Sequence, residues 1–276
     1  MDKKEDIRSF VRDAYAQIAT SKNSSCCGAN TSCTQTDAPE KLAEELGYSK
    51  TELEILPEGT NMGLSCGNPT AIASLKSGEV VLDLGSGGGL DVFIAAEKVG
   101  ASGTAIGVDM TYEMLMKARK NAKTFSERTK LNNVEFRLGE IEYLPVANNS
   151  VDAVISNCVI NLSPNKPQVW KEIYRVLKPG GRAAVSDLAL LRPLPENIVE
   201  SVSALVGCVA GAVLIDETEK MIKDAGFLKY RFDKKPGYIE KMTQWNDPLY
   251  CKIIELLPKD KKLGDYITSL DVSVTK

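Results

Sequence analysis

Seven cysteines and no histidine define the chemistry that this 276-residue sequence can perform. The count is odd and the charged start MDKKEDIRSF does not resemble a secretion signal, so a disulfide framework is not expected. Thiols in a reducing compartment more often bind metals or react, although any one of them could be a small buried hydrophobic residue. The absence of histidine removes the commonest catalytic base and any Cys–His pair. The cysteines are Cys26, Cys27, Cys33, Cys66, Cys158, Cys208 and Cys251.

Asn157 and Cys158 follow directly on a predicted apolar strand, in the stretch SNCVINLSPN. Ligands of open α/β sheets bind at the carboxyl ends of the strands. This strand is expected to lie beside the first strand of the sheet, across the point where the strand order reverses. Cys158 is therefore expected to face the reactive part of a bound ligand.

A glycine-rich turn, DLGSGGGLD, follows the first predicted strand and opens a helix. Gly85, Gly87 and Gly89 would let the backbone turn tightly and approach a ligand without interference from a Cβ atom. Asp109 lies about 20 residues further on, at the end of the next strand, where nucleotide-binding folds hold ribose hydroxyl groups. The alternative is a purely structural glycine loop in another α/β protein.

Strands that alternate with helices must position these groups. Because such alternation builds βαβ units, the pattern predicts a doubly wound, mostly parallel α/β sheet. Two further strands in the C-terminal tail bring the sheet to seven. The strands are expected at 79–85, 104–110, 134–139, 152–157, 182–188, 228–233 and 266–275.

The chain is expected to have three parts. Residues 1–75 form a helical extension, with helices at 5–19 and 39–48 and a Cys-rich loop between them. Residues 76–190 form the core. Residues 191–276 complete the sheet, and helices are expected at 195–225 and near 246–256.

Composition and charge exclude several classes of protein. The net charge is −3 and the pI is about 5.4, so the basic surface of a nucleic-acid-binding protein is not expected. No apolar run approaches the roughly 18 residues of a membrane-spanning helix. The expectation is a cytoplasmic protein, monomeric, without nucleic-acid or membrane partners.

The motifs of the core resemble those of the class I S-adenosylmethionine (SAM) methyltransferases. The pattern D-x-G-x-G-x-G at 83–89, the turn LGEIEYLP and the segment VLKPGGRAAVSD match that superfamily over roughly residues 76–190. The resemblance implies a Rossmann-like fold and SAM as the cofactor. It implies that SAM is bound by Asp83, Gly85, Ser86, Gly87, Gly89, Asp109, Met110, Glu140, Ile141 and Asn157.

Three cysteines and their surroundings narrow the resemblance to the arsenite methyltransferases. Cys66 in GLSCGNP, Cys158 in SNCVINL and Cys208 in VGCVAGAV are similar to that family, as is GVDMT at 107–111. This resemblance covers most of residues 60–225. It implies an enzyme of arsenic detoxification in which these three thiolates bind arsenic(III) and arsenite is methylated.

Such a reaction needs no general base. Trivalent arsenic is soft and binds thiolates, and it keeps a lone pair that can attack the electrophilic methyl group of SAM. The protein would mainly position the reactants and keep water out.

Methyl transfer oxidises arsenic to the pentavalent state, so two electrons must return. A further cysteine could form a disulfide with an arsenic-binding one, and a thiol reductant such as thioredoxin, glutaredoxin or glutathione would then reduce the protein. Family members place that further cysteine N-terminal to Cys66. Cys26, Cys27 and Cys33 are the candidates here, while Cys26 and Cys27 could instead collect arsenite or have no role.

Two other functions remain open. The chain could methylate a small organic acceptor, with its cysteines incidental. It could also be a non-enzymatic, thiol-based protein that binds metalloids on a methyltransferase fold. A zinc site is not expected, because the sequence has neither a C-x-x-C pair nor histidine. Asp187 is expected to be structural and Cys251 to pack in a core.

Overall fold

The computed structural model describes residues 3–20, 38–199, 208–244 and 253–276. Cys26, Cys27, Cys33 and Cys251 lie outside the described residues, as do the predicted Cys-rich loop and most of the predicted helix near 246–256.

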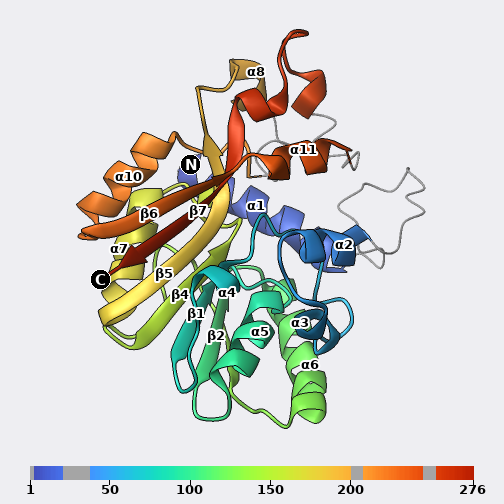
Figure 1. The fold of residues 1–276 in the computed structure, drawn as a ribbon, viewed down its shortest axis with the longest axis vertical. Coiled ribbons are helices and arrows are strands. Elements are labelled where there is room, and N and C mark those ends of the chain that lie inside the picture. Colours follow the sequence, from blue (N-terminus) through green and yellow to red (C-terminus); the bar gives the residue numbers. More distant parts are fainter. Residues whose placement is uncertain (1–2, 21–37, 200–207, 245–252) are drawn as a thin grey trace.

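A seven-stranded sheet runs through the molecule in the order β3-β2-β1-β4-β5-β7-β6 (Figure 1). The first five strands pair in parallel, whereas β7 is antiparallel to both β5 and β6. The predicted fold class is confirmed. The strands are β1 (Val80–Leu84), β2 (Thr104–Asp109), β3 (Val134–Leu138), β4 (Val151–Asn157), β5 (Leu177–Leu190), β6 (Lys229–Lys235) and β7 (Ile267–Thr275).

Helices cover both faces of this sheet. On one face, α5 (Leu90–Val99) and α6 (Tyr112–Thr129) bury Phe93 and Phe125 against the strands. On the other, α7 (Lys166–Val176) and α10 (Ile215–Asp224) bury Trp170 and Ile222. The central strands are therefore apolar on both faces, as expected for parallel strands in a doubly wound sheet.

Three segments gather around the carboxyl ends of the strands. The N-terminal helix α1 (Lys3–Thr20) and the C-terminal helix α11 (Gly237–Gln244) share a third apolar cluster with Cys66, Cys158 and Cys208 (Figure 1). The third segment contains the short helices α2 (Ala38–Glu45), α3 (Lys50–Glu54) and α4 (Pro69–Ile72). Helices α3 and α4 pack on the α5 face of the sheet, and the loop between them reaches the carboxyl ends of the strands.

Three details of the sequence-based prediction need correction. Strand β5 is longer than expected, since it runs through the PGG segment. The helix α11 was not predicted. The prediction that residues 195–225 are helical is confirmed at α8 (Glu196–Val199) and α10, but it is wrong at 208–214, which contains a turn. A Cβ atom at Gly211 would overlap the carbonyl oxygen of Asn161, so this turn packs more closely than a helix of larger residues allows.

No helix within the described ranges has the length and apolar character needed to cross a lipid bilayer.

Candidate active site

A cavity of about 1030 Å³, its open mouth included, lies at the carboxyl ends of β1, β2 and β4. Among the residues predicted from the sequence, those lining it are Asp83, Gly85, Ser86, Gly87, Asp109, Met110, Ile141, Asn157 and Cys158. Gly89 instead begins α5, and Glu140 lies beyond the cavity lining.

The glycine turn is fixed by backbone hydrogen bonds to the neighbouring strand. The N–H groups of Gly85 and Ser86 both donate to the carbonyl oxygen of Val108, at 2.8 and 3.0 Å. Gly85 has φ of +66°, and a Cβ atom there would overlap the side chain of Val159. The turn therefore needs glycine at this position for two reasons, its left-handed backbone and its close packing.

Asp109 connects the glycine turn to the end of β2. One oxygen of its carboxylate accepts a hydrogen bond from Gly87 N–H at 2.9 Å, and the other accepts one from Thr111 N–H at 2.8 Å. The carboxylate is buried and lines the cavity. The Thr111 side chain and the Met110 N–H group also contribute hydrogen bonds to this carboxylate.

Three buried carboxylates, Asp83, Asp91 and Asp109, give the cavity negative character. Burial raises the pKa of Asp91 to about 6. Burial also raises the pKa of Asp83 well above its ordinary value, and the charges of Asp91 and Asp109 add to this effect. No side chain in the described part of the chain donates a hydrogen bond to Asp83. The cavity is therefore suited to a ligand that carries positive charge.

Helix α1 covers part of this cavity with Arg8, Val11 and Tyr15. Arg8 Nε lies 3.5 Å from a carboxylate oxygen of Glu140 and 3.6 Å from one of Glu142. Glu140, predicted to contact the cofactor, is thus engaged by α1 at the edge of the site, while Ile141 and Glu142 line the cavity itself.

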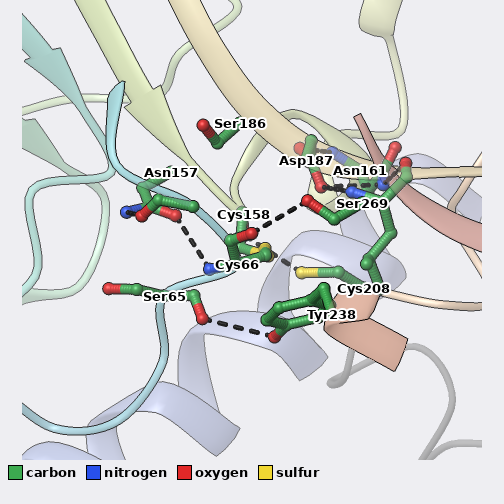
Figure 2. Close-up of a disulfide and its surroundings, with 12 residues drawn as sticks. Ser65, Cys66, Asn157, Cys158, Asn161, Ser186, Asp187, Cys208, Tyr238 and Ser269 are labelled. Atoms are coloured by element: carbon green, nitrogen blue, oxygen red, sulfur yellow. Dashed lines mark hydrogen bonds between the residues drawn. A yellow bond between two sulfur atoms is a disulfide. The ribbon is translucent and has the colours of Figure 1, made fainter. Parts of the chain in front are cut away.

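The structure brings the three predicted arsenic-binding cysteines together beside the cavity. Cys66 and Cys158 form a disulfide, with Cα atoms 5.9 Å apart across 92 positions of sequence. The Cys208 thiol donates a hydrogen bond to the carbonyl oxygen of Cys158 at 3.0 Å (Figure 2). Burial, and then the charge of Asp187, raises the pKa of the Cys208 thiol well above its ordinary value. In this oxidised form Cys208 is a protonated thiol.

The peptide groups around Cys66 are held by side chains from three distant elements (Figure 2). Asn157 Oδ1 accepts a hydrogen bond from Cys66 N–H at 3.0 Å, and Ser269 Oγ donates to the Cys66 carbonyl oxygen at 2.9 Å. Tyr238 Oη donates to the carbonyl oxygen of Ser65 at 3.2 Å. Cys66 has no regular secondary structure to position it, so these contacts fix the place of its sulfur.

Asn157 also links the cysteines to the cavity. Its Nδ2 group lies within hydrogen-bonding distance of the Gly67 carbonyl oxygen, of Tyr48 Oη and of an Asp91 carboxylate oxygen, at 3.0, 3.1 and 3.2 Å. Tyr48 Oη in turn donates to Asp91 at 2.7 Å. Sequence reasoning missed Tyr48 and Asp91, although Asp91 stands in the first turn of the helix that follows the glycine turn.

Cys158 and Cys208 both adopt a left-handed backbone, with φ of +56° and +61°. Non-glycine residues seldom take this conformation, and such residues concentrate at functional sites. At Cys158 the geometry is held by a hydrogen bond from its N–H to the carbonyl oxygen of Ser186, at 2.8 Å. The backbone therefore turns sharply at two of the three cysteines.

Asp187 lies among these sulfur atoms, at the end region of β5. A carboxylate oxygen of Asp187 and the sulfur atoms of Cys66 and Cys158 all lie within 4.8 Å of one another. Burial raises the Asp187 pKa to about 6. Asp187, which was expected to be structural, lies on β5 next to the strand that ends in Asn157, and it accepts hydrogen bonds from Asn161 and Leu188.

Comparison with known proteins identifies relatives of this chain. A family model described as a methyltransferase domain matches residues 75–226. Arsenite methyltransferase of Halobacterium salinarum is 42% identical over 280 residues, covering 99% of this chain and 67% of that protein. Arsenite methyltransferase of Aquipseudomonas alcaligenes is 35% identical over 226 residues, covering 81% of this chain and 61% of that protein. The chain thus spans about two thirds of the length of these relatives.

A solved structure supports the same relationship. The arsenic(III) S-adenosylmethionine methyltransferase of Chlamydomonas reinhardtii superimposes with a TM-score of 0.60 and 31% sequence identity. The match covers 86% of this chain and 73% of that one.

Proposed function

Because this chain belongs to the arsenite methyltransferases, S-adenosylmethionine-dependent enzymes with the class I fold, we propose that it methylates trivalent arsenic held by its own cysteine thiolates. One observation carries the proposal. Three cysteines from distant parts of the sequence meet beside the cavity, and Cys158 itself lines that cavity. The product would be methylated arsenicals, and the role detoxification.

The residues that line the cavity suit SAM in charge and polarity. When bound, SAM supplies an electrophilic methyl group on a positively charged sulfonium. The buried carboxylates of Asp83, Asp91 and Asp109 offer the negative environment that such a cation needs. We assign Asp109 to the ribose hydroxyl groups and Asp83 to the methionine ammonium group. Met110 and Ile141 offer apolar contacts to the adenine.

Arsenite would bind to Cys66, Cys158 and Cys208 once the Cys66–Cys158 disulfide is reduced. Each thiol replaces one hydroxyl group of arsenite and its proton leaves with that hydroxyl as water, so binding three thiols releases three waters. Soft sulfur ligands favour this soft element. The burial of Cys66 and Cys208 keeps competing water away.

Methylation of thiol-bound arsenic requires no general base from the protein. The lone pair of the bound arsenic would attack the methyl carbon and S-adenosylhomocysteine would leave with the electrons of the broken S–CH3 bond, so no proton has to be removed. Positioning by Asn157, which contacts the Cys66 segment and lines the cavity, is therefore the main contribution expected from the protein. This agrees with a sequence that contains no histidine.

The Cys66–Cys158 disulfide supports a route for the electrons. Methyl transfer raises arsenic to the pentavalent state, and two thiolates that join in a disulfide return two electrons to it. A thiol reductant of the thioredoxin, glutaredoxin or glutathione type would then restore the thiols. Cys26, Cys27 and Cys33 remain candidates for a further thiol in this exchange.

The remaining expectations belong to the same proposal. Residues 1–75 would be the extension with the Cys-rich loop, 76–190 the SAM-binding core, and 191–276 the part that completes the sheet and the arsenic site. We propose a monomer acting in the cytoplasm, where thiol reductants are abundant.

Mass spectrometry of the products from arsenite, SAM and a thiol reductant tests the function. Methylated arsenic species that increase with time support it. Absence of methylated arsenic from a protein that binds S-adenosylhomocysteine with ordinary affinity would overturn it. Protection of the thiols from alkylation by arsenite, lost when Cys66, Cys158 or Cys208 is replaced, separates this function from methylation of an organic acceptor.

A further inference from the structure

The oxygen donor beside the sulfur atoms has no part in the arsenic chemistry proposed above. Trivalent arsenic takes three sulfur ligands, and its lone pair occupies the fourth direction. Asp187 nevertheless directs a carboxylate oxygen to within 4.8 Å of the Cys66 and Cys158 sulfurs. A donor set of three sulfurs and one oxygen instead suits a tetrahedral divalent cation.

We propose that the reduced site also binds zinc, through the thiolates of Cys66, Cys158 and Cys208 and the carboxylate of Asp187. The sequence argued against a zinc site because it has no C-x-x-C pair and no histidine. The fold removes that objection. It brings ligand atoms of Cys66, Cys158 and Asp187 within 4.8 Å of one another, and the Cys208 thiol lies 3.0 Å from the carbonyl oxygen of Cys158 (Figure 2).

The carboxylate is already oriented as a metal ligand. One of its oxygens accepts hydrogen bonds from Asn161 Nδ2 and from Leu188 N–H, both at 2.8 Å. The other accepts a hydrogen bond from Asn161 N–H at 3.2 Å, and the Ile160 N–H group adds a further hydrogen bond to the carboxylate. Fixed outer contacts of this kind hold ligating carboxylates in well-formed metal sites.

The charges around the site are compatible with a bound cation. Three thiolates and one carboxylate carry four negative charges, of which zinc neutralises two. Lys166 adds a positive charge that interacts with both Asp187 and Cys208. A cation can enter through the cavity, since Cys158 lines it.

The disulfide makes this binding dependent on redox state. While Cys66 and Cys158 are joined, neither offers a thiolate. A two-electron reductant breaks the S–S bond to give two thiols, and zinc binding then releases their protons. Zinc would also exclude arsenite from the reduced enzyme. That competition rests on the proposed function, whereas zinc binding itself does not.

Zinc titration of the reduced full-length protein tests the proposal. The protein carries serine at Cys26, Cys27, Cys33 and Cys251, so that only the three described cysteines remain, and a phosphine keeps them reduced. Competition with a chromogenic chelator measures zinc affinity. Cobalt(II) replaces zinc for spectroscopy, because tetrahedral sulfur ligation gives charge-transfer and d–d bands. We expect one zinc per chain, and none in the oxidised protein.

The variant Asp187→Asn distinguishes zinc binding from arsenite binding. Loss of a direct ligand should weaken zinc by about 100-fold or more, since even outer contacts cost 10- to 100-fold. Arsenite affinity should stay unchanged, because arsenic uses only the sulfurs. Asp260→Asn, at an exposed aspartate, is the matched control.

Three results would overturn the zinc proposal. They are no zinc binding by the reduced protein, equal zinc affinity in Asp187→Asn and the control, and zinc binding that survives oxidation. S-adenosylhomocysteine binding shows that each variant is folded, and Cys208→Ser gives a second test if Asp187→Asn does not fold. Failure to methylate arsenite would refute the proposed function while leaving the zinc result intact.

Discussion

The two halves of the site are built in different ways. The cofactor half is centred on one continuous stretch, in which β1, the glycine turn, α5 and β2 follow one another between Val80 and Asp109, while Ile141, Asn157 and α1 complete the lining. The thiol half is assembled from Cys66, Cys158, Asp187, Cys208 and Ser269, which belong to separate segments. Residues that are close in sequence thus form the centre of the cofactor half, while the thiol half forms only when the complete fold brings distant residues together.

The bonds that hold the two halves differ as well. Backbone hydrogen bonds to β2 hold the glycine turn. Side chains hold the Cys66 peptide, through Asn157 and Ser269. A single substitution can remove a side-chain contact but not a strand pairing, so the thiol half should be the more sensitive to mutation. Substitutions that affect one half without the other test this difference.

The largest effect is expected from Cys158→Ser and Cys208→Ser. Each should abolish methylation of both arsenite and methylarsenite, because both substrates need these two sulfurs. Affinity for S-adenosylhomocysteine, measured by calorimetry, should remain within about twofold, since serine preserves the shape of the site. If cofactor binding fell together with methylation, the two halves would not be separable.

Cys66→Ser should reduce the methylation of arsenite more than the methylation of methylarsenite. Methylarsenite has one position occupied by a methyl group and needs two thiolates, so its methylation should be retained far better than that of arsenite. Replacing Cys26, Cys27 and Cys33 should have the same pattern if one of them supplies electrons. Product analysis by mass spectrometry measures both rates, and an equal loss on both substrates would refute this division of roles.

The same contrast explains what the sequence could predict. The order of strands and helices, the glycine turn and Asp109 follow from local patterns that the fold preserves. The positions of Tyr48 and Asp187 beside the site could not be predicted, because nothing near them in sequence indicates which side chains the fold brings close. The turn at 208–214 was mistaken for a helix because its cause, the approach of Gly211 to Asn161, is a tertiary contact.

Asp109→Ala should damage the cofactor half alone. The variant loses hydrogen bonds to Gly87 and Thr111 N–H groups and the proposed contact to ribose. Hydrogen bonds to a charged group contribute about 1.5–3 kcal/mol, so SAM should bind about 10- to 100-fold more weakly. Arsenite binding, followed by protection of the thiols, should not change. Asp260→Ala is the control, and weakened arsenite binding in Asp109→Ala would contradict the separation.

Gly211→Ala should damage the thiol half alone. The added methyl group would overlap the Asn161 carbonyl oxygen and displace the turn that carries Cys208. Overpacking of this kind costs about 1–3 kcal/mol of unfolding free energy, or several degrees in Tm. Arsenite affinity should fall while S-adenosylhomocysteine affinity holds. Gly237→Ala is the matched control, because a Cβ atom there meets nothing within 4 Å. Equal behaviour of the two variants would show that the close approach is unimportant.

The smallest effect is expected from pH, and it tests the charge of the cofactor half. Asp91 has a pKa of about 6 in the folded protein, and that of Asp83 is also raised. The folded protein therefore holds protons that the unfolded chain has already lost, so these groups make the unliganded protein less stable as pH rises through about 4 to 6.

A cation bound in the cavity opposes this loss of stability at higher pH. It lowers the pKa of the carboxylates around it, so their protons are released. SAM carries the sulfonium charge and S-adenosylhomocysteine does not. The preference for SAM over S-adenosylhomocysteine should therefore grow between about pH 5 and about pH 7.5, by about three- to tenfold, since one pKa unit corresponds to a factor of ten. Calorimetry in two buffers of different ionisation enthalpy measures the released protons. If both ligands showed the same pH dependence, the carboxylates would not be responding to the sulfonium, and their burial would need another explanation.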